Sequence, residues 1–437
     1  MFESLAQSLR LPDLRRRILF TLAILAIYRL AAQVPVPGAD RAAITQILEG
    51  TGAVGRLGNF LNLMTGGALE QFSVMAMGVY PYITASIIMQ LMTPLIPALE
   101  ELSKEGESGR NKINQWTYWM TIPLCIAQAF AQIALLNSAG GGVNIVEFGA
   151  ADPLNSVTVL MALTAGTMFA LWLGERITEE GLGNGVSIII FVSIAAQIPT
   201  NLINLATSNV LSLVIVALFT VGIVYAIVII QEGHRRIPVQ YGRQVRGQKV
   251  YGGQSTFIPL RVNSTGMIPL IFATSLMIFP GVIGSLMASS DNDTLRSFGI
   301  TLQNTFISGS SWVYFLVYFI LVVGFTYFYA DVIFRQQSLH ETLQRNGGFI
   351  PGIRPGQRTE SYLTFVLHRI TAFGALFLGI VAVIPYFMQF ITPGGLTPQQ
   401  SMIVDSAGLL IVVGVVVDTI KQLQAQLLMR NYEGFIK

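Results

Sequence analysis

The sequence has little of the chemistry that catalysis or metal binding requires. Among its 437 residues there is one cysteine, Cys125, and there are three histidines. A single cysteine excludes an intramolecular disulfide and any metal site made of several cysteines, and we expect Cys125 to be a buried core residue. The histidines all fall in or beside polar connections, and none of the motifs HExxH, GxSxG and GxxxxGK(S/T) occurs. We therefore predict a chain that is not an enzyme, needs no cofactor and does not hydrolyse ATP itself.

Charged residues are also scarce, at 11% of the chain, while 52% of the residues are hydrophobic. Soluble domains carry about 25% charged residues, and the mean hydropathy here is +0.61. Since a helix needs roughly 20 mainly apolar residues to cross a bilayer, the sequence predicts an all-α, polytopic membrane protein with ten transmembrane helices. The predicted spans are 18–34, 73–97, 116–137, 156–173, 186–201, 208–230, 266–289, 312–334, 369–392 and 402–420.

Ionisable residues are nearly missing from these spans. Arg29, Asp331 and Asp418 lie near span ends, from which their side chains can reach an interface. Ion-coupled transporters usually carry ionisable groups at mid-membrane. A proton relay is therefore not expected.

Lysine and arginine are distributed unequally between the two sides of the predicted membrane domain. Of the 26 basic residues, 22 fall in the N-terminal tail and the segments that share its side, whereas Arg41, Arg56 and Arg296 fall on the other side. Basic residues concentrate in cytoplasmic loops. We therefore predict that both termini are cytoplasmic.

Ten spans divide into an N-terminal half, 1–205, and a C-terminal half, 206–437. Because five is odd, the second half enters the membrane from the opposite side, as in an inverted repeat with a path between the halves. Proline and glycine interrupt helices, and they occur in the second span of both halves, at Pro81, Pro94, Pro97, Gly266, Pro269 and Pro280. The residues alone leave two classes open, a channel and a secondary transporter of a small solute.

Two connections on the predicted cytoplasmic side, 231–264 and 335–369, are long and basic. Positive-inside bias explains the sign of their charge, but a topology signal needs only a few residues. Basic surfaces of this size suit an acidic partner, either protein or RNA.

The stretch LNLMTGGALEQFSVMAMG at 61–78 is apolar at its start, is broken by Gly66–Gly67 and is charged at Glu70. The part before Gly66 is too short to cross a bilayer. Non-spanning backbone at membrane depth is tolerated only where protein buries it or where it lines a cavity.

Six motifs carry a resemblance to a known family. They are PYITASIIMQL at 81–91, KEGESGRNKINQ at 104–115, WLGERITEEGLGNGVSIIIF at 172–191, STGMIPLIFATS at 264–275, NGGFIPGIRPGQRT at 346–359 and LLIVVGVVVDTIKQ at 409–422. In this order, over nearly the whole chain, they resemble the SecY family of channel-forming subunits of the bacterial Sec protein translocase.

The resemblance implies a clamshell of two halves around an hourglass pore in the bacterial plasma (inner) membrane. Such a channel passes unfolded secretory polypeptides across the membrane and opens sideways to release transmembrane segments into lipid. The implied partners are the SecE and SecG subunits, the SecA ATPase, the ribosome, the unfolded preprotein with its signal peptide, and membrane lipid.

The resemblance also implies roles for individual residues. The matching pore ring is Ile83, Ile87, Ile189, Ile271 and Ile411. The segment 58–70 matches the plug, a short helix that closes the resting pore, with Asn59, Phe60, Leu61, Leu63, Met64, Gly66, Gly67 and Leu69. The lateral gate would include Gln90, Gly266 and Pro269, and Gln90 should find an interhelical partner or line the opening. Docking of cytoplasmic partners falls to Arg243, Arg246, Lys249, Arg354 and Arg358.

Overall fold

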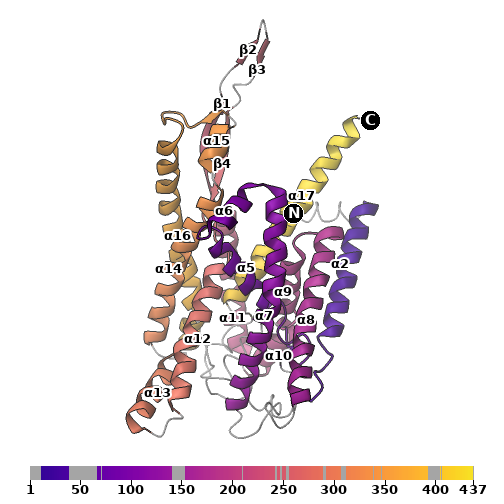
Figure 1. Ribbon diagram of the computed structural model, residues 1–437, viewed down its shortest axis with the longest axis vertical. Helices are drawn as coiled ribbons and strands as arrows, with labels where there is room; N and C mark the ends of the chain where they lie inside the picture. The colour runs from indigo at the N-terminus through magenta and orange to yellow at the C-terminus, as the bar shows by residue number, and fades with distance from the viewer. Residues whose placement is uncertain are drawn as a thin grey trace.

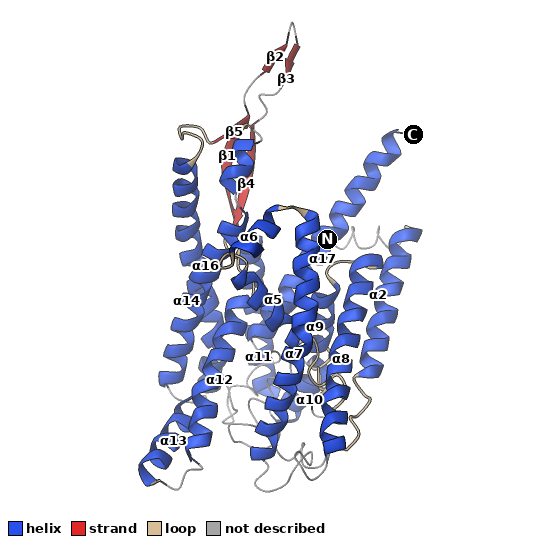
Figure 2. Cartoon of the chain, viewed as in Figure 1, coloured by secondary structure: helices blue, strands red, loops and turns tan. Residues whose placement is uncertain are grey.

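The computed structural model describes residues 11–38, 66–69, 71–139, 153–208, 210–241, 244–246, 249–251, 255–288, 292–306, 312–337, 339–345, 347–391, 404 and 406–436. Within these ranges the chain is mostly helical, and the helices run side by side between two ends of the molecule (Figure 1). Short strands project from one end (Figure 2). This arrangement fits a membrane protein with an extension at one end.

The helices of the first half follow the apolar runs of the sequence. They are α2 (Pro12–Ala31), α5 (Tyr80–Met92), α6 (Pro97–Lys104), α7 (Glu107–Ala139), α8 (Pro153–Glu180), α9 (Gly185–Ala195) and α10 (Ile198–Ser208). Asn184 caps α9 by accepting a hydrogen bond from the Ser187 backbone N–H through its side chain, which satisfies one of the free donors at the helix start.

The second half alternates long helices with the strands. Its helices are α11 (Val210–Glu232), α12 (Ile268–Ala288), α13 (Asp293–Phe306), α14 (Trp312–Gln337), α15 (Leu339–Arg345), α16 (Gln357–Ile391) and α17 (Ser406–Ile436). The strands are β1 (His234–Tyr241), β2 (Gln244–Arg246), β3 (Lys249–Tyr251), β4 (Ser255–Arg261) and β5 (Gly348–Phe349).

All ten predicted spans contain helix, but not always with the predicted bounds. In the described part of the chain, six helices are long and apolar enough to cross a membrane, and α5 with α6 would make a seventh. Helices α2, α7 and α12 occupy three more predicted spans. Helices α13 and α15 were not predicted.

The second predicted span, 73–97, is only partly helical. Residues 73–79 form turns, and α5 begins at Tyr80. The axis then bends by 97° between α5 and α6. Pro97 lies at the start of α6, and the residue before a proline is pushed out of helical geometry; Ile96 is indeed extended. The prolines noted in the sequence therefore end a span here.

One small sheet joins the two long basic connections. Its order is β4–β1–β5, so a strand from 348–349 pairs with the hairpin from 234–261. Strands β1 and β4 pair antiparallel from His234 with Arg261 to Gln240 with Ser255, and β5 adds to β1 at Gln240 and Tyr241. The connections 231–264 and 335–369, predicted as separate basic loops, thus form one platform.

That platform has an apolar core of its own. Ile237 and Val239 of β1 pack with Leu260, Phe334 and Leu363 in a buried cluster. The cluster draws on α14 and α16 as well as on the strands. The sheet is therefore anchored on the helices instead of hanging free as a loop.

Candidate functional site

The largest apolar cluster of the molecule contains members of the predicted pore ring from three helices. Ile189 of α9 and Ile411 of α17 belong to its buried core, and Ile83 of α5 packs against it as a half-buried side chain. Ile87 and Ile271 are also buried, with 5% and 8% of their surfaces exposed, but they are not members of that cluster. The five isoleucines thus come from four helices, and burial brings three of them together.

Aliphatic side chains with no charge among them have a defined physical effect at a constriction. Water leaves a narrow apolar passage, and ions cannot cross it without their hydration. Ile83 and Ile87 lie four residues apart on α5, so they share one face of that helix. A constriction lined by aliphatic side chains alone blocks ions without a charged gate.

The end of the predicted plug segment is buried between helices. Gly66, Ala68 and Leu69 are buried, and Leu69 has no exposed surface. Ala68 belongs to the same apolar cluster as Ile189 and Ile411. Leu69 faces a second cluster, formed with Phe72 and with residues of α7 and α8. The segment Gly66–Leu69 therefore wedges between the central cluster and the neighbouring helices.

Backbone pairing fixes the segment that follows. The Ser73 N–H donates to the Ala68 carbonyl at 2.9 Å, and the Val36 N–H donates to the Phe72 carbonyl at 2.9 Å. Pro35 and Ser73 form an antiparallel bridge. This bridge joins the end of α2 to the end of the plug segment, so neither can move far without the other.

Arginine 29 makes the most informative polar contact in this region. Its Nη1 donates to the Gly66 carbonyl oxygen at 2.8 Å. Next to it on α2, the Tyr28 hydroxyl shares a hydrogen bond of 3.0 Å with the Ser193 hydroxyl of α9. The sequence predicts that Arg29 lies near a span end and reaches the interface. In the structure Arg29 lies in the last turn of α2, and its partner is the Gly66 backbone.

Five of the predicted plug residues, Asn59, Phe60, Leu61, Leu63 and Met64, lie outside the described residues. Among the described ones, Gly66 and Leu69 are buried and Gly67 is half-buried. Of the predicted plug segment, the structure therefore describes only the base, residues 66–69.

The predicted gate residue Gln90 has an interhelical partner, as expected. Its Oε1 accepts a hydrogen bond from the Tyr329 hydroxyl of α14, and its Nε2 donates to Ser86 Oγ at 3.2 Å. The partner helix is α14, and not α12, which follows or contains the other predicted gate residues, Gly266 and Pro269. Pro269 is buried in the first turn of α12, and Gly266, just before it, has a φ of +62° with nothing within 4 Å of a Cβ at its position.

Four of the five predicted docking residues lie in described parts of the two basic connections. Arg354 and Arg358 are exposed, and the Arg354 carbonyl accepts a hydrogen bond from Thr359 Oγ1 at 2.9 Å, which closes the turn before α16. Arg246 and Lys249 face each other in the β2–β3 pair. Arg243 lies outside the described residues.

Ion pairs connect the platform to the last helix. Lys421 Nζ lies 2.8 Å from Glu232 Oε1, and Arg261 Nη1 lies 3.8 Å from Asp418 Oδ1. Asp331 Oδ1 lies 3.6 Å from His368 Nε2. Asp418 and Asp331, the acidic residues near span ends, are therefore paired with basic residues of the two long connections.

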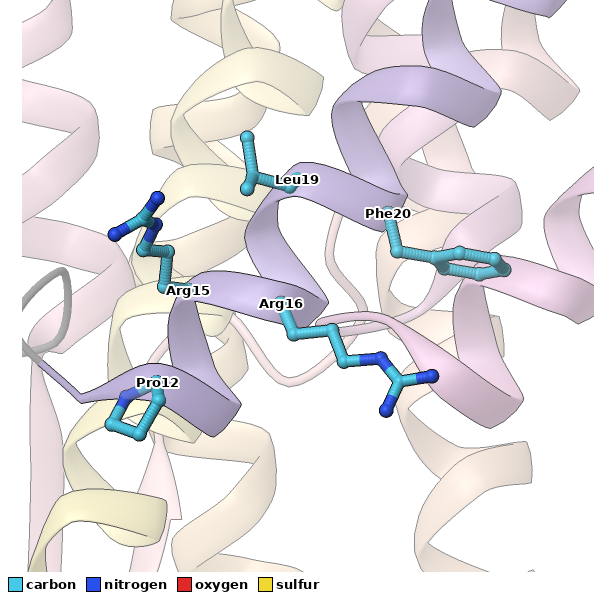
Figure 3. Close-up of a pocket in the computed structure, with 5 residues that line it drawn as sticks. All are labelled: Pro12, Arg15, Arg16, Leu19 and Phe20. Atoms are coloured by element: carbon cyan, nitrogen blue, oxygen red, sulfur yellow. The ribbon is translucent and has the colours of Figure 1, made fainter.

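Two other features lie outside the central cluster, a hollow at the start of α2 and the single cysteine. The hollow is lined by Pro12, Arg15, Arg16, Leu19 and Phe20. The guanidinium groups of Arg15 and Arg16 point in different directions (Figure 3), so they form no two-arginine anion clamp. Cys125 is buried and its Sγ donates to Thr167 Oγ1 at 3.4 Å. Among the described residues, no group of three or more His, Cys, Asp or Glu could hold a metal ion.

Comparison with known proteins matches the chain to one family. The SecY family model matches residues 73–420. The protein translocase subunit SecY of Mycobacterium tuberculosis H37Rv is 41% identical over 445 residues, covering all of both chains. In one solved structure of SecY, the plug domain of that protein stabilises the closed state of the translocation channel and maintains a membrane seal. This structure has a TM-score of 0.60 at 17% identity, over 94% of this chain and 91% of that one. Canine Sec61 in a ribosome–channel complex has a TM-score of 0.58 at 16% identity with the same coverage.

Proposed function

The chain belongs to the SecY family, and we propose that it is a protein-conducting channel for unfolded secretory polypeptides. The observation that carries this proposal is that three of the five proposed ring residues, from separate helices, belong to or pack against one buried apolar cluster, which the base of a non-spanning segment also joins. The secondary transporter of a small solute finds no support among the relatives named above.

In this proposal the ring and the plug divide the work of sealing. The isoleucine ring, Ile83, Ile87, Ile189, Ile271 and Ile411, is the constriction that excludes ions by dewetting. The plug, around 58–70, closes the outer funnel at rest. During transport, aliphatic side chains part around an extended chain without reading its sequence, because they offer it no hydrogen-bonding groups.

The lateral gate lies between the halves 1–205 and 206–437. Helix α11 runs toward the end of the molecule that carries the strands, whereas α2 begins near that end and runs away from it (Figure 1). Opposite directions of the first helices are expected of an inverted second half. The hydrogen bond from Tyr329 to Gln90 crosses between these halves. Gly266 and Pro269 supply a hinge at the start of α12. Parting of the halves there would release transmembrane segments into lipid.

The energy for transport comes from partners outside this chain. Arg354 and Arg358 are exposed, and we assign them, together with Arg243, Arg246 and Lys249 of the other basic connection, to the docking of the SecA ATPase or the ribosome. The SecE and SecG subunits complete the complex. The chain itself supplies no catalysis, sits in the bacterial plasma membrane and keeps both termini cytoplasmic, in agreement with its charge distribution.

Transport into vesicles tests this function directly. The full complex is reconstituted, supplied with the motor ATPase and ATP, and assayed for a secretory polypeptide that becomes protected from protease. We expect Arg354→Glu to reduce the protected fraction at least about tenfold, since it reverses the charge at the docking surface. Its matched control is Arg345→Glu, another exposed arginine of the same connection.

An equal loss in both variants would point to general charge instead of a docking residue. No loss in Arg354→Glu would remove this residue from the docking surface. No protected polypeptide with the unmodified complex would contradict the channel itself.

A further inference from the structure

We infer that Arg29 is a positioning residue that holds the plug base in its closed seat, and that the seat is built from Arg29, Gly66 and the backbone of Ser193. This inference rests on the proposed plug and adds the contact that keeps it closed. The seat is defined here as these three residues, from α2, from the end of the plug segment and from α9.

The first support is the position of the guanidinium. Arg29 is half-buried in the last turn of α2, and its Nη1 donates to the Gly66 carbonyl oxygen at 2.8 Å. A hydrogen bond with a charged donor is stronger than one between neutral groups. Charged side chains near a membrane interior are also costly, and they persist where they have a defined partner. Here that partner is the backbone of the plug segment.

The second support is the fit of Gly66 against α9. A Cβ at Gly66 would lie 2.7 Å from the Ser193 carbonyl oxygen, 2.8 Å from Ser193 Cα and 2.9 Å from Arg29 Nη1. Contacts this short cannot be relieved by turning a flexible side chain, because two of the three atoms belong to the backbone. Only glycine lets the plug base approach α9 this closely.

The third support is the link from the seat to the ring. Ser193 Oγ donates to the Ile189 carbonyl at 2.9 Å, one turn earlier on α9. The Tyr28 hydroxyl contacts the same Ser193 side chain. The plug base therefore contacts the turn of α9 that follows Ile189, a proposed ring residue. A displacement of α9 would also move Ser193 and so change the seat.

Gly67 provides a matched control within the same turn. Gly66 and Gly67 have φ values of +69° and +88°, so a side chain at either position is strained by the left-handed backbone. A Cβ at Gly67, however, meets only the Gln197 side-chain nitrogen, at 4.0 Å. Alanine at Gly66 adds a clash with the seat, whereas alanine at Gly67 adds the backbone strain alone.

The test measures resting ion conductance of the full complex in planar bilayers. The variants are Arg29→Gln, Arg29→Lys, Gly66→Ala, Gly67→Ala, the double variant Arg29→Gln with Gly66→Ala, and a chain lacking residues 60–70. We expect Arg29→Gln and Gly66→Ala each to raise conductance at least about fivefold toward the level of the deletion. Arg29→Lys should lie between, since it keeps the charge, and Gly67→Ala should change conductance less than about twofold.

The double variant asks whether the two residues act through one contact. If they do, its conductance should match the larger single variant, since changes in one shared contact do not add. Multiplied effects would mean two independent roles and would overturn the seat. Unfolding temperature is measured for every variant, because a general loss of stability would raise conductance together with a lowered unfolding temperature.

The remaining outcomes separate this inference from the plug itself. If the deletion raises conductance but Arg29→Gln and Gly66→Ala do not, the plug stands and the seat is wrong. If Gly67→Ala matches Gly66→Ala, backbone strain explains both and the seat is wrong. If the deletion leaves conductance unchanged, the plug assignment fails. Should Arg29→Gln not fold, the pair Gly66→Ala and Gly67→Ala decides.

Discussion

Gln90 illustrates what one polar side chain does inside an apolar helix. Its amide is half-buried on α5, and both of its ends find hydrogen-bond partners, Ser86 on its own helix and Tyr329 on α14. A buried amide without partners would cost about 1–3 kcal/mol. The contact with Tyr329 therefore stabilises the closed approach of α5 and α14 and resists their separation.

Removal of this contact should ease opening of the gate. Tyr329→Phe keeps the buried ring and deletes the hydroxyl, so we expect the closed state to lose about 1 kcal/mol. The vesicle assay, run with a secretory polypeptide whose signal peptide is weakened, should then show about a threefold to fivefold gain in transport. Tyr327→Phe, on the same helix but with its ring partly exposed, should show no gain. Equal transport in the two variants would contradict a role for the Gln90 contact.

The sequence predicts that such contacts exist better than it predicts their partners. A glutamine in a predicted span implies a hydrogen bond, and one is present, but nothing in the spacing of residues points to Tyr329. The same argument applies to Arg29, since an arginine at the end of an apolar run is costly without a partner. Its partner is a backbone carbonyl, which no residue type reveals. For Cys125 the sequence predicts only burial, and Cys125 is buried.

Among the elements, α8 and the start of α9 approach each other closely enough for backbone contact. A Cβ at Gly185 would lie 1.9 Å from the Gly174 carbonyl oxygen. Small residues allow helices in membranes to approach closely enough for backbone contact. The turn between the two helices is also closed by the Gly185 N–H, which donates to Thr178 Oγ1 at 2.9 Å.

A pair of glycine substitutions tests this crossing. Gly185→Ala should force α8 and α9 apart and lower the stability of the complex by about 2 kcal/mol or more. Gly222→Ala, in the middle of α11, has nothing within 4 Å of the new Cβ, so its stability should stay within about 1 kcal/mol and should tend to rise, because alanine favours helix more than glycine does. Thermal unfolding in one detergent measures both, and similar unfolding temperatures would contradict the crossing.

The elements were predicted unevenly, and the reasons are physical. Apolar runs predict helices well because the bilayer fixes their length. The bend between α5 and α6 was visible as prolines but not as an angle. The strand β1 carried a readable signal, since Ile237 and Val239 are buried and alternate with exposed neighbours. The pairing of β1 with β5 joins residues more than a hundred positions apart, and no local pattern predicts that.

For the whole molecule, the unequal distribution of basic residues makes a topological prediction. With Cys125 replaced by alanine, a single cysteine is introduced at exposed Gln344 of α15 or at exposed Ser297 of α13. A maleimide that cannot cross membranes should label Gln344→Cys only from the cytoplasmic side and Ser297→Cys only from the opposite side. Labelling of both from one side would contradict the proposed orientation.

At this scale the sequence predicts the architecture in outline. Ten apolar runs and their charge asymmetry predict two halves of opposite direction, and Figure 1 shows the helices side by side between the two ends of the molecule. The two basic connections could not be recognised as one platform, because their shared cluster around Ile237 and Leu363 forms only after folding. The convergence of ring residues likewise depends on helices far apart in the chain.

The seat has a consequence for how the protein is made. Arg29, Gly66 and Ser193 all precede residue 206, so every group of the seat belongs to the first half of the chain. Chains are synthesised from the N-terminus and their parts fold in that order. The three residues of the proposed seat can therefore come together while α11 to α17 are still unmade, and the second half of the chain then adds its part of the central cluster, including Ile411, around Ala68.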